Sequence, residues 1–249
     1  MRHFTLHRPA RRNALTPALA RALAKEIDAV AEAGETRAIV LRGAGAHFCS
    51  GLDLHWLQSL GAMPTITQLR QGLGDFQSAV LAVARCPLPV VAVVEGTAAG
   101  FGLDLALACD IRIAAAGATF TSAFARMGLV PDGGSTFLLP RLTGPGQALR
   151  LLLGGETLDA ERARAIGLVD EVAEPAALEE RLGSLLAGLA AAAPGSVRAI
   201  KRLVRAPELG TLEQALAAEG EAQLQALQGP EFRRRLESFT ARAARPEGA

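Results

Sequence analysis

Two glycine-rich turns give the first indication of chemistry in this sequence. Residues 51–54 (GLDL) follow an apolar run at 38–42, and residues 96–102 (GTAAGFG) follow another at 89–94. Glycine permits tight turns and close backbone approach, and a helix that begins at such a turn offers unpaired N–H groups to an anion. Two turns of this kind could aim donors at one developing oxyanion, where a single donor contributes about 3–4 kcal/mol.

Two other interpretations of these turns stand beside the oxyanion hole. Glycine turns between a buried strand and a helix are common and need no ligand. A dinucleotide-binding turn also follows a strand, but short-chain dehydrogenases place it near the N-terminus and usually add a catalytic tyrosine. This turn lies in mid-chain and the sequence contains no tyrosine, which argues against a dinucleotide site.

Carboxylates and imidazoles near these turns could move protons. Asp132 precedes two glycines, a context that also suits an ordinary turn. Asp104 lies just after the second glycine turn. His47 and His55 flank the first turn and could act as acid or base, although loop histidines are commonly solvated. Asp53 and Asp110 are expected to cap or hydrogen-bond turns. The four histidines are too scattered for a metal-ligand spacing, so no metal is expected.

The elements that must position these residues follow from periodicity and punctuation. Thr16-Pro17 predicts a helix start with a capping side chain and a proline in the first turn, and the helix should run to about Gly34. The other expected elements are strands at 3–8, 38–42, 89–94 and 111–114, a helix at 65–84, and helices from about 175 onward with breaks at Pro194, Pro207 and Gly229-Pro230. Alternating strands and helices followed by a helical tail predict an α/β protein.

A short internal repeat supports stacked units. The tetrapeptide Gly-Leu-Asp-Leu occurs at 51–54 and again at 102–105, each time after a strand-like run. A repeated strand, glycine turn and helix start favours a spiral of similar units.

Composition excludes several classes of protein. The 249 residues are 50% hydrophobic and 20% charged with a net charge of +1, so neither disorder nor attraction to nucleic acid or an anionic membrane is indicated. The three cysteines form no disulfide framework, which fits a reducing compartment. No signal-peptide core or membrane-spanning stretch is evident, so we expect a cytoplasmic protein.

Five ordered blocks of sequence resemble the crotonase superfamily, the enoyl-CoA hydratase/isomerase family. Residues 48–54 (FCSGLDL) and 96–110 (GTAAGFGLDLALACD) are similar to its two signatures. The remaining blocks are 8–15 (RPARRNAL), 128–134 (GLVPDGG) and 163–170 (ARAIGLVD). The resemblance implies a crotonase-like spiral of ββα units over residues 1–190, and a C-terminal helical region at 191–249 for trimerisation and pocket cover. It also implies an acyl-CoA thioester substrate, a homotrimer or dimer of trimers, and no cofactor other than the CoA carried by the substrate.

The family pattern assigns the oxyanion donors to the backbone N–H groups of Leu52 and Phe101. CoA is then expected to follow the Phe48–Asp53 loop through backbone contacts, with Arg11 or Arg12 near its phosphates. Trp56 and residues 61–74 are expected to cover the acyl pocket. The residues expected to contact substrate are Phe48, Ser50, Gly51, Asp53, Trp56, Gly100, Phe124 and Arg12.

The catalytic carboxylates differ from the hydratase pattern. Hydratases of this family hold the attacking water between two glutamates; Asp104 stands at the first position and Phe124 at the second. Phe124 cannot accept a proton, whereas Asp132 matches the catalytic aspartate of dienoyl-CoA and phenylacetate-pathway isomerases. The resemblance therefore favours an isomerase with Asp132 and Asp104 as catalytic residues. A hydratase, another crotonase-type lyase or thioester hydrolase, and a non-catalytic acyl-CoA binder are the alternatives.

Overall fold

The computed structural model describes residues 1–61, 63–206 and 210–243, with side chains described as far as 237. The chain divides into two compact units, Met1–Leu189 and Ala190–Ala249. The first unit contains all the residues for which a catalytic or substrate-binding role is expected. Pro207, where a helix break was expected, lies outside the described residues.

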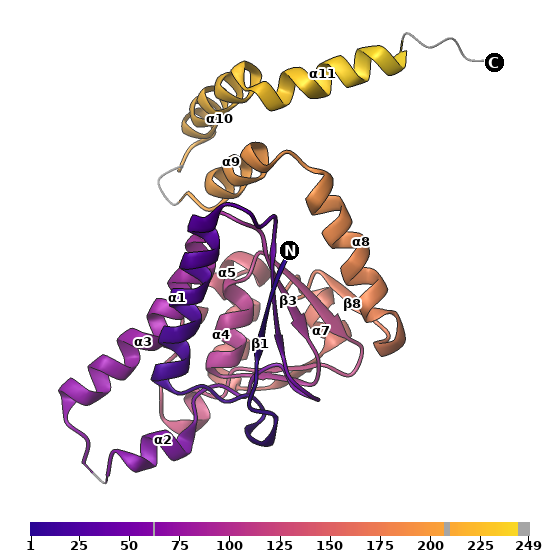
Figure 1. Ribbon diagram of the computed structural model, residues 1–249. Coiled ribbons are helices and arrows are strands. Elements are labelled where there is room, and N and C mark those ends of the chain that lie inside the picture. Colours follow the sequence, from indigo (N-terminus) through magenta and orange to yellow (C-terminus); the bar gives the residue numbers. More distant parts are fainter. Residues whose placement is uncertain (62, 207–209, 244–249) are drawn as a thin grey trace. The chain divides into compact units, whose positions relative to one another are not determined.

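A five-stranded parallel sheet forms the centre of the first unit (Figure 1). Its strand order is β1-β2-β3-β5-β8. The strands are β1 (Arg2–Leu6), β2 (Ile39–Gly43), β3 (Val90–Val94), β5 (Ile111–Ala115) and β8 (Glu171–Ala173). All four pairings are parallel. The strands expected from the apolar runs are therefore present and lie side by side.

Each central strand of this sheet contributes to two hydrophobic cores. Along β2, Ile39 and Leu41 belong to one core with the helices α1 (Pro17–Ala33), α3 (Ile66–Arg85) and α4 (Phe101–Ala108), while Val40 faces the other. The second core includes Leu178, Leu182 and Leu186 of α8 (Leu178–Ala191). Successive side chains of a strand point to opposite faces, so a sheet covered on both faces needs strands that are apolar throughout.

Capping residues fix the two long helices of the first core. α1 (Pro17–Ala33) begins after Thr16, whose hydroxyl accepts the N–H of Leu19, and it ends at Gly34 with φ of 73°. α3 (Ile66–Arg85) begins with a capping box between Thr65 and Gln68. Reciprocal side-chain bonds of this kind satisfy N–H groups that the first turn leaves unpaired. Both helices match their expected positions.

A smaller three-stranded sheet carries the second glycine turn. It has the order β4-β6-β7, with β4 (Thr97–Ala99), β6 (Thr119–Thr121) and β7 (Thr157–Asp159). α4 (Phe101–Ala108) follows β4 directly and is buried along its whole length. The sequence interpretation missed these strands, because three residues are too few to show an alternating pattern.

The other elements complete the two units. The first unit also contains α2 (Leu54–Ser59), α5 (Ser135–Thr143), α6 (Pro145–Gly154), α7 (Ala160–Ala165) and α8 (Leu178–Ala191), with 3-10 turns at Pro9–Arg11, Ala125–Met127 and Pro175–Ala177. The second contains α9 (Pro194–Val204), α10 (Leu212–Gln228) and α11 (Pro230–Ala243). Helix starts at Pro194 and Pro230 agree with the expected breaks.

The repeated tetrapeptide does not occupy equivalent positions. In the first copy Asp53 caps α2, whereas the second copy lies inside α4. The strands that precede the two copies, β2 and β3, do pair in parallel. The repeat therefore indicated the stacked strands correctly but not the local structure of the turns.

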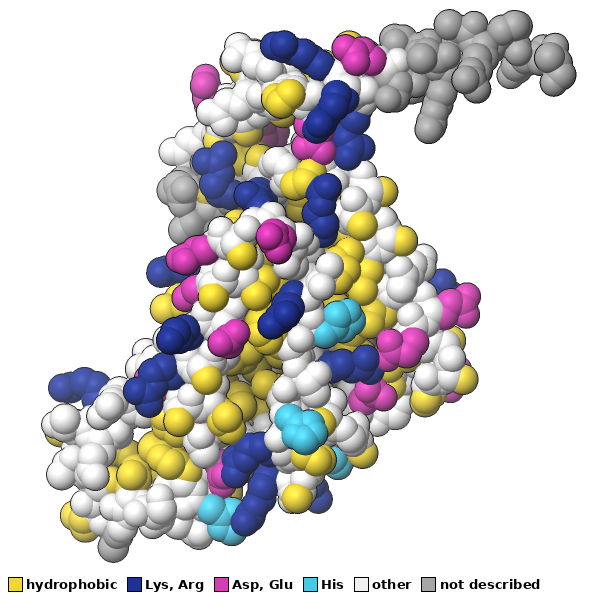
Figure 2. All heavy atoms as spheres, in the orientation of Figure 1, with side chains coloured by type: hydrophobic (Ala, Val, Ile, Leu, Met, Phe, Trp, Pro, Cys, Tyr) yellow, Lys and Arg dark blue, Asp and Glu magenta, His cyan; other side chains and the backbone are white. Residues whose placement is uncertain are grey.

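On the face seen in Figure 2, Lys and Arg side chains are interspersed with Asp and Glu. Within the described residues no helix alone has the length and apolarity to span a membrane; the helical segments 175–191 and 194–204 meet that test only when taken together.

Candidate active site

The two glycine turns run side by side and are held by backbone hydrogen bonds. The Cys49 N–H donates to the Thr97 carbonyl, and the Ala99 N–H donates to the Cys49 carbonyl, both at 3.0 Å. Gly51 has φ of 97°, and a Cβ there would lie 2.8 Å from the Ala99 oxygen and 3.1 Å from the Phe101 nitrogen. Only glycine allows this close approach. Gly51, which precedes Leu52, therefore lies against the backbone nitrogen of Phe101.

The N–H groups of Leu52 and Phe101 are unpaired within the described structure. The Leu15 N–H donates to the Gly51 carbonyl, and the Leu15 carbonyl accepts the Asp53 N–H. Neither bond uses the N–H of Leu52, which lies between these two residues. Phe101 is the first residue of α4, and no carbonyl of the described residues accepts its N–H. Two unpaired donors on adjoining segments are what an oxyanion hole requires.

The side chain of Phe101 anchors its backbone. It is 3% exposed, and its ring packs edge-to-face on Phe76 of α3 with centroids 4.7 Å apart. Gly100, with φ of 52°, donates its N–H to the Thr121 carbonyl. A buried ring on one side and a strand bond on the other fix the direction of the Phe101 N–H. The side chain of Phe101 belongs to the core.

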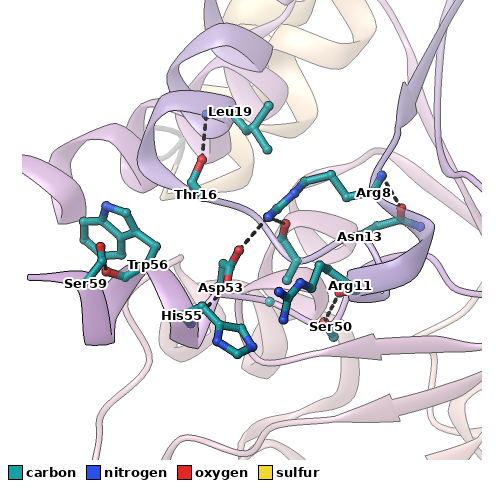
Figure 3. A network of polar contacts seen from close by, with 12 residues as sticks. Arg8, Arg11, Asn13, Thr16, Leu19, Ser50, Asp53, His55, Trp56 and Ser59 are labelled. Atoms are coloured by element: carbon teal, nitrogen blue, oxygen red, sulfur yellow. Dashed lines mark hydrogen bonds and ion pairs between the residues drawn. The ribbon is translucent and has the colours of Figure 1, made fainter.

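Arg8 and Asp53 fix the first turn from the other side (Figure 3). The Arg8 guanidinium lies 2.7 Å from the Asp53 carboxylate, and Asp53 also accepts the N–H of His55 at the start of α2. Burial alone would raise the pKa of Asp53, but the hydrogen bond and charge of Arg8 and the N–H of His55 outweigh it and lower the pKa. Asp53 caps a turn, as expected, and is too buried and too fully paired to contact a ligand readily.

The segment around Arg12 lines the loop expected to bind CoA. Ser50 donates its N–H to the Arg12 carbonyl and its hydroxyl to the Arg11 carbonyl. Arg12 has φ of 47° and an exposed side chain. The side chain of Phe48 is fully buried, so only its backbone could contact a ligand. Burial raises the pKa of the Cys49 thiol to about 12, which makes it a packing residue and not a nucleophile.

Asp104 is fully buried and tied to the turn that carries Asp132. Its carboxylate accepts the Gly133 N–H at 3.1 Å and is hydrogen-bonded to the Ser135 hydroxyl. Burial raises the pKa of Asp104 to about 8; the nearby Asp132 adds to the rise and the Gly133 N–H opposes it. With 0% of its surface exposed, Asp104 has no atom through which to touch a substrate.

Asp132 is half-buried beside this network. Burial raises its pKa, and the next residue, Gly133, donates its N–H to Asp104, which brings the turn of Asp132 to the Asp104 carboxylate. The sequence interpretation paired these two aspartates, and the fold brings them to one place. A carboxyl that remains partly exposed with a raised pKa is suited to take and return protons near neutral pH.

The remaining expected contacts are distributed around these turns. Trp56 lies on α2, and its ring packs against Gly72 of α3. Phe124 is half-buried and its carbonyl accepts the N–H groups of Met127 and Leu129. Gly100 faces open space, since an added Cβ would meet no atom within 4 Å. Most of 61–74, expected as a pocket cover, forms the beginning of α3.

Comparison with known proteins decides the family. The sequence profile of the family described as "Enoyl-CoA hydratase/isomerase" matches residues 2–245.

The chain belongs to the enoyl-CoA hydratase/isomerase family.

Relatives within this family are similar along nearly their whole length. A probable enoyl-CoA hydratase of Rhodobacter capsulatus is 38% identical, covering 95% of this chain and 90% of the relative. The 1,2-epoxyphenylacetyl-CoA isomerase of Escherichia coli is 34% identical, covering 96% and 91%. A solved structure from Thermobifida fusca, described as a putative enoyl-CoA hydratase in complex with acetoacetyl-CoA, is 34% identical with a TM-score of 0.83, covering 90% of each chain.

The family assignment confirms the main expectations from sequence. The crotonase-like α/β fold, the enzyme class and acyl-CoA as the substrate class are those of an enoyl-CoA hydratase/isomerase. Sequence reasoning missed two partners. Arg8 lay within a motif but received no role, and Ser135 was not singled out, because its partner Asp104 lies 31 positions away in the sequence.

Proposed function

We propose that this enzyme is an acyl-CoA isomerase that shifts a C=C bond, with Asp132 as its base. The observation that carries the proposal is the pair of unpaired N–H groups, Leu52 and Phe101, on adjoining turns. Bound to the thioester oxygen, they stabilise the enolate that forms when a proton leaves the acyl chain.

The reaction needs only a carboxylate and the oxyanion donors. Asp132 takes a proton from the carbon next to the thioester, or from a conjugated carbon further along. The electrons of the broken C–H bond move into the enolate, and its negative charge collects on the oxygen held by Leu52 and Phe101. The Asp132 carboxyl then returns the proton to another carbon of the same system. No atom is gained or lost, and no cofactor besides the CoA of the substrate is called for.

Asp104 serves as a positioning residue in this proposal. At neutral pH a carboxyl with a pKa of about 8 is largely protonated, so Asp104 adds little negative charge beside Asp132. Its bonds to Gly133 and Ser135 hold the turn that directly follows the base. This role replaces the catalytic role that the resemblance implied for Asp104, because Asp104 has no exposed surface.

Hydration is the second candidate, and the names of hydratases among the relatives favour it. Adding water requires a group that binds and activates it. Phe124, at the position where hydratases carry the second glutamate, has no acceptor atom. One relative, the 1,2-epoxyphenylacetyl-CoA isomerase of Escherichia coli, is named as an isomerase, which supports isomerisation for this chain.

Product identification separates the two candidates. The wild-type enzyme should be incubated with 2-enoyl-, 3-enoyl- and dienoyl-CoA thioesters, and the products examined by mass and NMR. Isomerisation leaves the mass unchanged, whereas hydration adds one water. Rapid hydration of crotonyl-CoA would overturn the isomerase proposal.

Asp132→Asn tests the base directly. The amide is nearly isosteric but cannot accept the proton, so kcat should fall by orders of magnitude while CoA binding persists. Asp104→Asn should cost less, because Asp104 does not touch substrate. A fully active Asp132→Asn combined with an inactive Asp104→Asn would reverse the two roles.

We further propose that acyl-CoA lies along residues 48–53, with Arg11 or Arg12 at its phosphates. The Thermobifida fusca neighbour, described as a complex with acetoacetyl-CoA, supports such a ligand. Acetoacetyl-CoA should raise the melting temperature with the logarithm of its concentration above saturation. No shift and no calorimetric heat at millimolar ligand would count against acyl-CoA binding.

A homotrimer or dimer of trimers is also part of the proposal. Exposed apolar side chains on the C-terminal helices support it, since such surface is commonly buried between subunits. They include Ile200 and Val204 of α9 and Leu212, Leu216 and Leu224 of α10. The three cysteines are buried and form no disulfide, which agrees with our proposal of a reducing, cytoplasmic location.

A further inference from the structure

We propose that His47 is a positioning residue that sets the register between the two oxyanion turns; this rests on the proposed oxyanion hole. His47 lies half-buried at the entrance to the first turn. Its Nδ1 accepts the N–H of Thr97 at 3.2 Å, where the second turn begins. The imidazole therefore bridges the two segments that end in the donors Leu52 and Phe101.

The bond replaces a missing backbone bond of a parallel ladder. Cys49 pairs with Ala98, so the next backbone bond in that pattern would run from the Thr97 N–H to the His47 carbonyl. That carbonyl instead accepts the Asn13 Nδ2–H at 2.6 Å, and the Thr97 N–H donates to the imidazole. The side chain of His47 thus supplies the acceptor in place of its backbone.

Close packing leaves little freedom at this bridge. A Cβ on Gly96 would lie 2.0 Å from the Ala46 oxygen and 2.8 Å from the His47 Nδ1. A Cβ on Gly43 would lie 2.0 Å from the His47 oxygen. With both faces of the segment in contact, the Thr97–His47 bond acts together with the two Cys49 backbone bonds to set the distance between the first turn and the second.

The geometry also determines the form of the imidazole. A backbone N–H can only donate, so Nδ1 carries the lone pair and the ring proton, in the neutral form, lies on Nε2. His47 is thus occupied in holding the backbone and does not serve as the acid or base considered from the sequence. Its contribution appears only where the two donors must act together, at the polarised thioester carbonyl.

Amide replacements give a matched test of this role. In His47→Asn the side-chain oxygen lies near the place of Nδ1, whereas in His47→Gln it lies one bond further from the backbone. His47→Leu removes the acceptor, and His7→Leu, at an exposed histidine of the same unit, is the control. We expect His47→Leu and His47→Gln to lose roughly 10-fold or more in kcat, below the 10²–10³ for loss of a whole donor, at similar KM. We expect His47→Asn to stay within a few-fold of wild type.

Carbonyl polarisation measures the effect without turnover. Cinnamoyl-CoA labelled with ¹³C at the thioester carbonyl should shift downfield on binding wild type, His7→Leu and His47→Asn, and less on binding His47→Leu and His47→Gln. A full shift in folded His47→Leu, or equal behaviour of the Asn and Gln variants, would overturn the proposal. If His47→Leu does not fold, the comparison of Asn with Gln decides. An enzyme without isomerase activity would still give the carbonyl shift, so the two proposals fail separately.

Discussion

Replacing Gly51 by alanine should damage the oxyanion hole more than it damages the fold. The added Cβ would lie 2.8 Å from the Ala99 oxygen and 3.1 Å from the Phe101 nitrogen. Ordinary carbon contacts begin near 3.5 Å, so the two turns must separate by roughly half an ångström or more. The donors must lie within about 2.7–3.1 Å of the oxyanion, so this shift takes at least one of them out of range.

The expected loss follows from the value of one donor. Removing a donor entirely costs about 10²–10³ in kcat, and a displaced donor should cost about 10–100-fold. Alanine at φ of 97° also carries a strain of roughly 1–2 kcal/mol, which corresponds to about 2–8 °C in melting temperature for a chain of this size.

Gly34→Ala separates the strain from the contact. Gly34 ends α1 with φ of 73°, and an added Cβ would meet no atom closer than 4.0 Å. Both variants should melt at a lower temperature than wild type, but only Gly51→Ala should lose turnover, measured as kcat on a substrate identified from the panel of enoyl-CoA thioesters. A Gly51→Ala enzyme with wild-type kcat would refute the reasoning that these turns form the oxyanion hole.

Three further predictions concern charge and assembly. Because the pKa of Asp104 is raised to about 8 in the folded protein and is about 3.9 when unfolded, its contribution to stability is lost as pH rises between these values. Wild type should therefore lose melting temperature relative to Asp104→Asn between pH about 5 and 8, and the opposite trend would contradict a buried neutral Asp104. Arg8→Met leaves the Asp53 carboxylate without its cation and should cost about 1–3 kcal/mol in urea unfolding at pH 7. The pKa of Asp53 is lowered by folding, so this cost should shrink as pH falls below about 4, and a pH-independent cost would mean that packing dominates. Val204, 81% exposed on α9, is a candidate subunit contact, and Val204→Glu should lower the mass seen by light scattering; an unchanged oligomer would exclude this helix face.

Local signals allowed the regular elements to be predicted from the sequence. Thr16 before Pro17 marked the start of α1, and Gly34 marked its end. The apolar runs predicted β2, β3 and β5, because strands covered on both faces need no polar alternation. The strands of the smaller sheet, three residues each, carried no such signal.

The order of the motifs was enough to indicate the family and the chemistry of the site. The motifs at 48–54 and 96–110 located the two turns, and Phe124 in place of a glutamate argued against hydration. These inferences rest on residue type and order along the chain, which the sequence records directly.

Only the tertiary structure showed which groups are already occupied. The N–H groups of Leu52 and Phe101 matter because their neighbours are bonded to Leu15 and Thr121, while no carbonyl of the described residues accepts them. Ser135, 31 positions away, lies on the Asp104 carboxylate, and this contact led us to propose Asp104 as a positioning residue. Hydrogen bonding and desolvation depend on contacts between residues far apart in the sequence, so the proposals for Asp104 and His47 could come only from the fold.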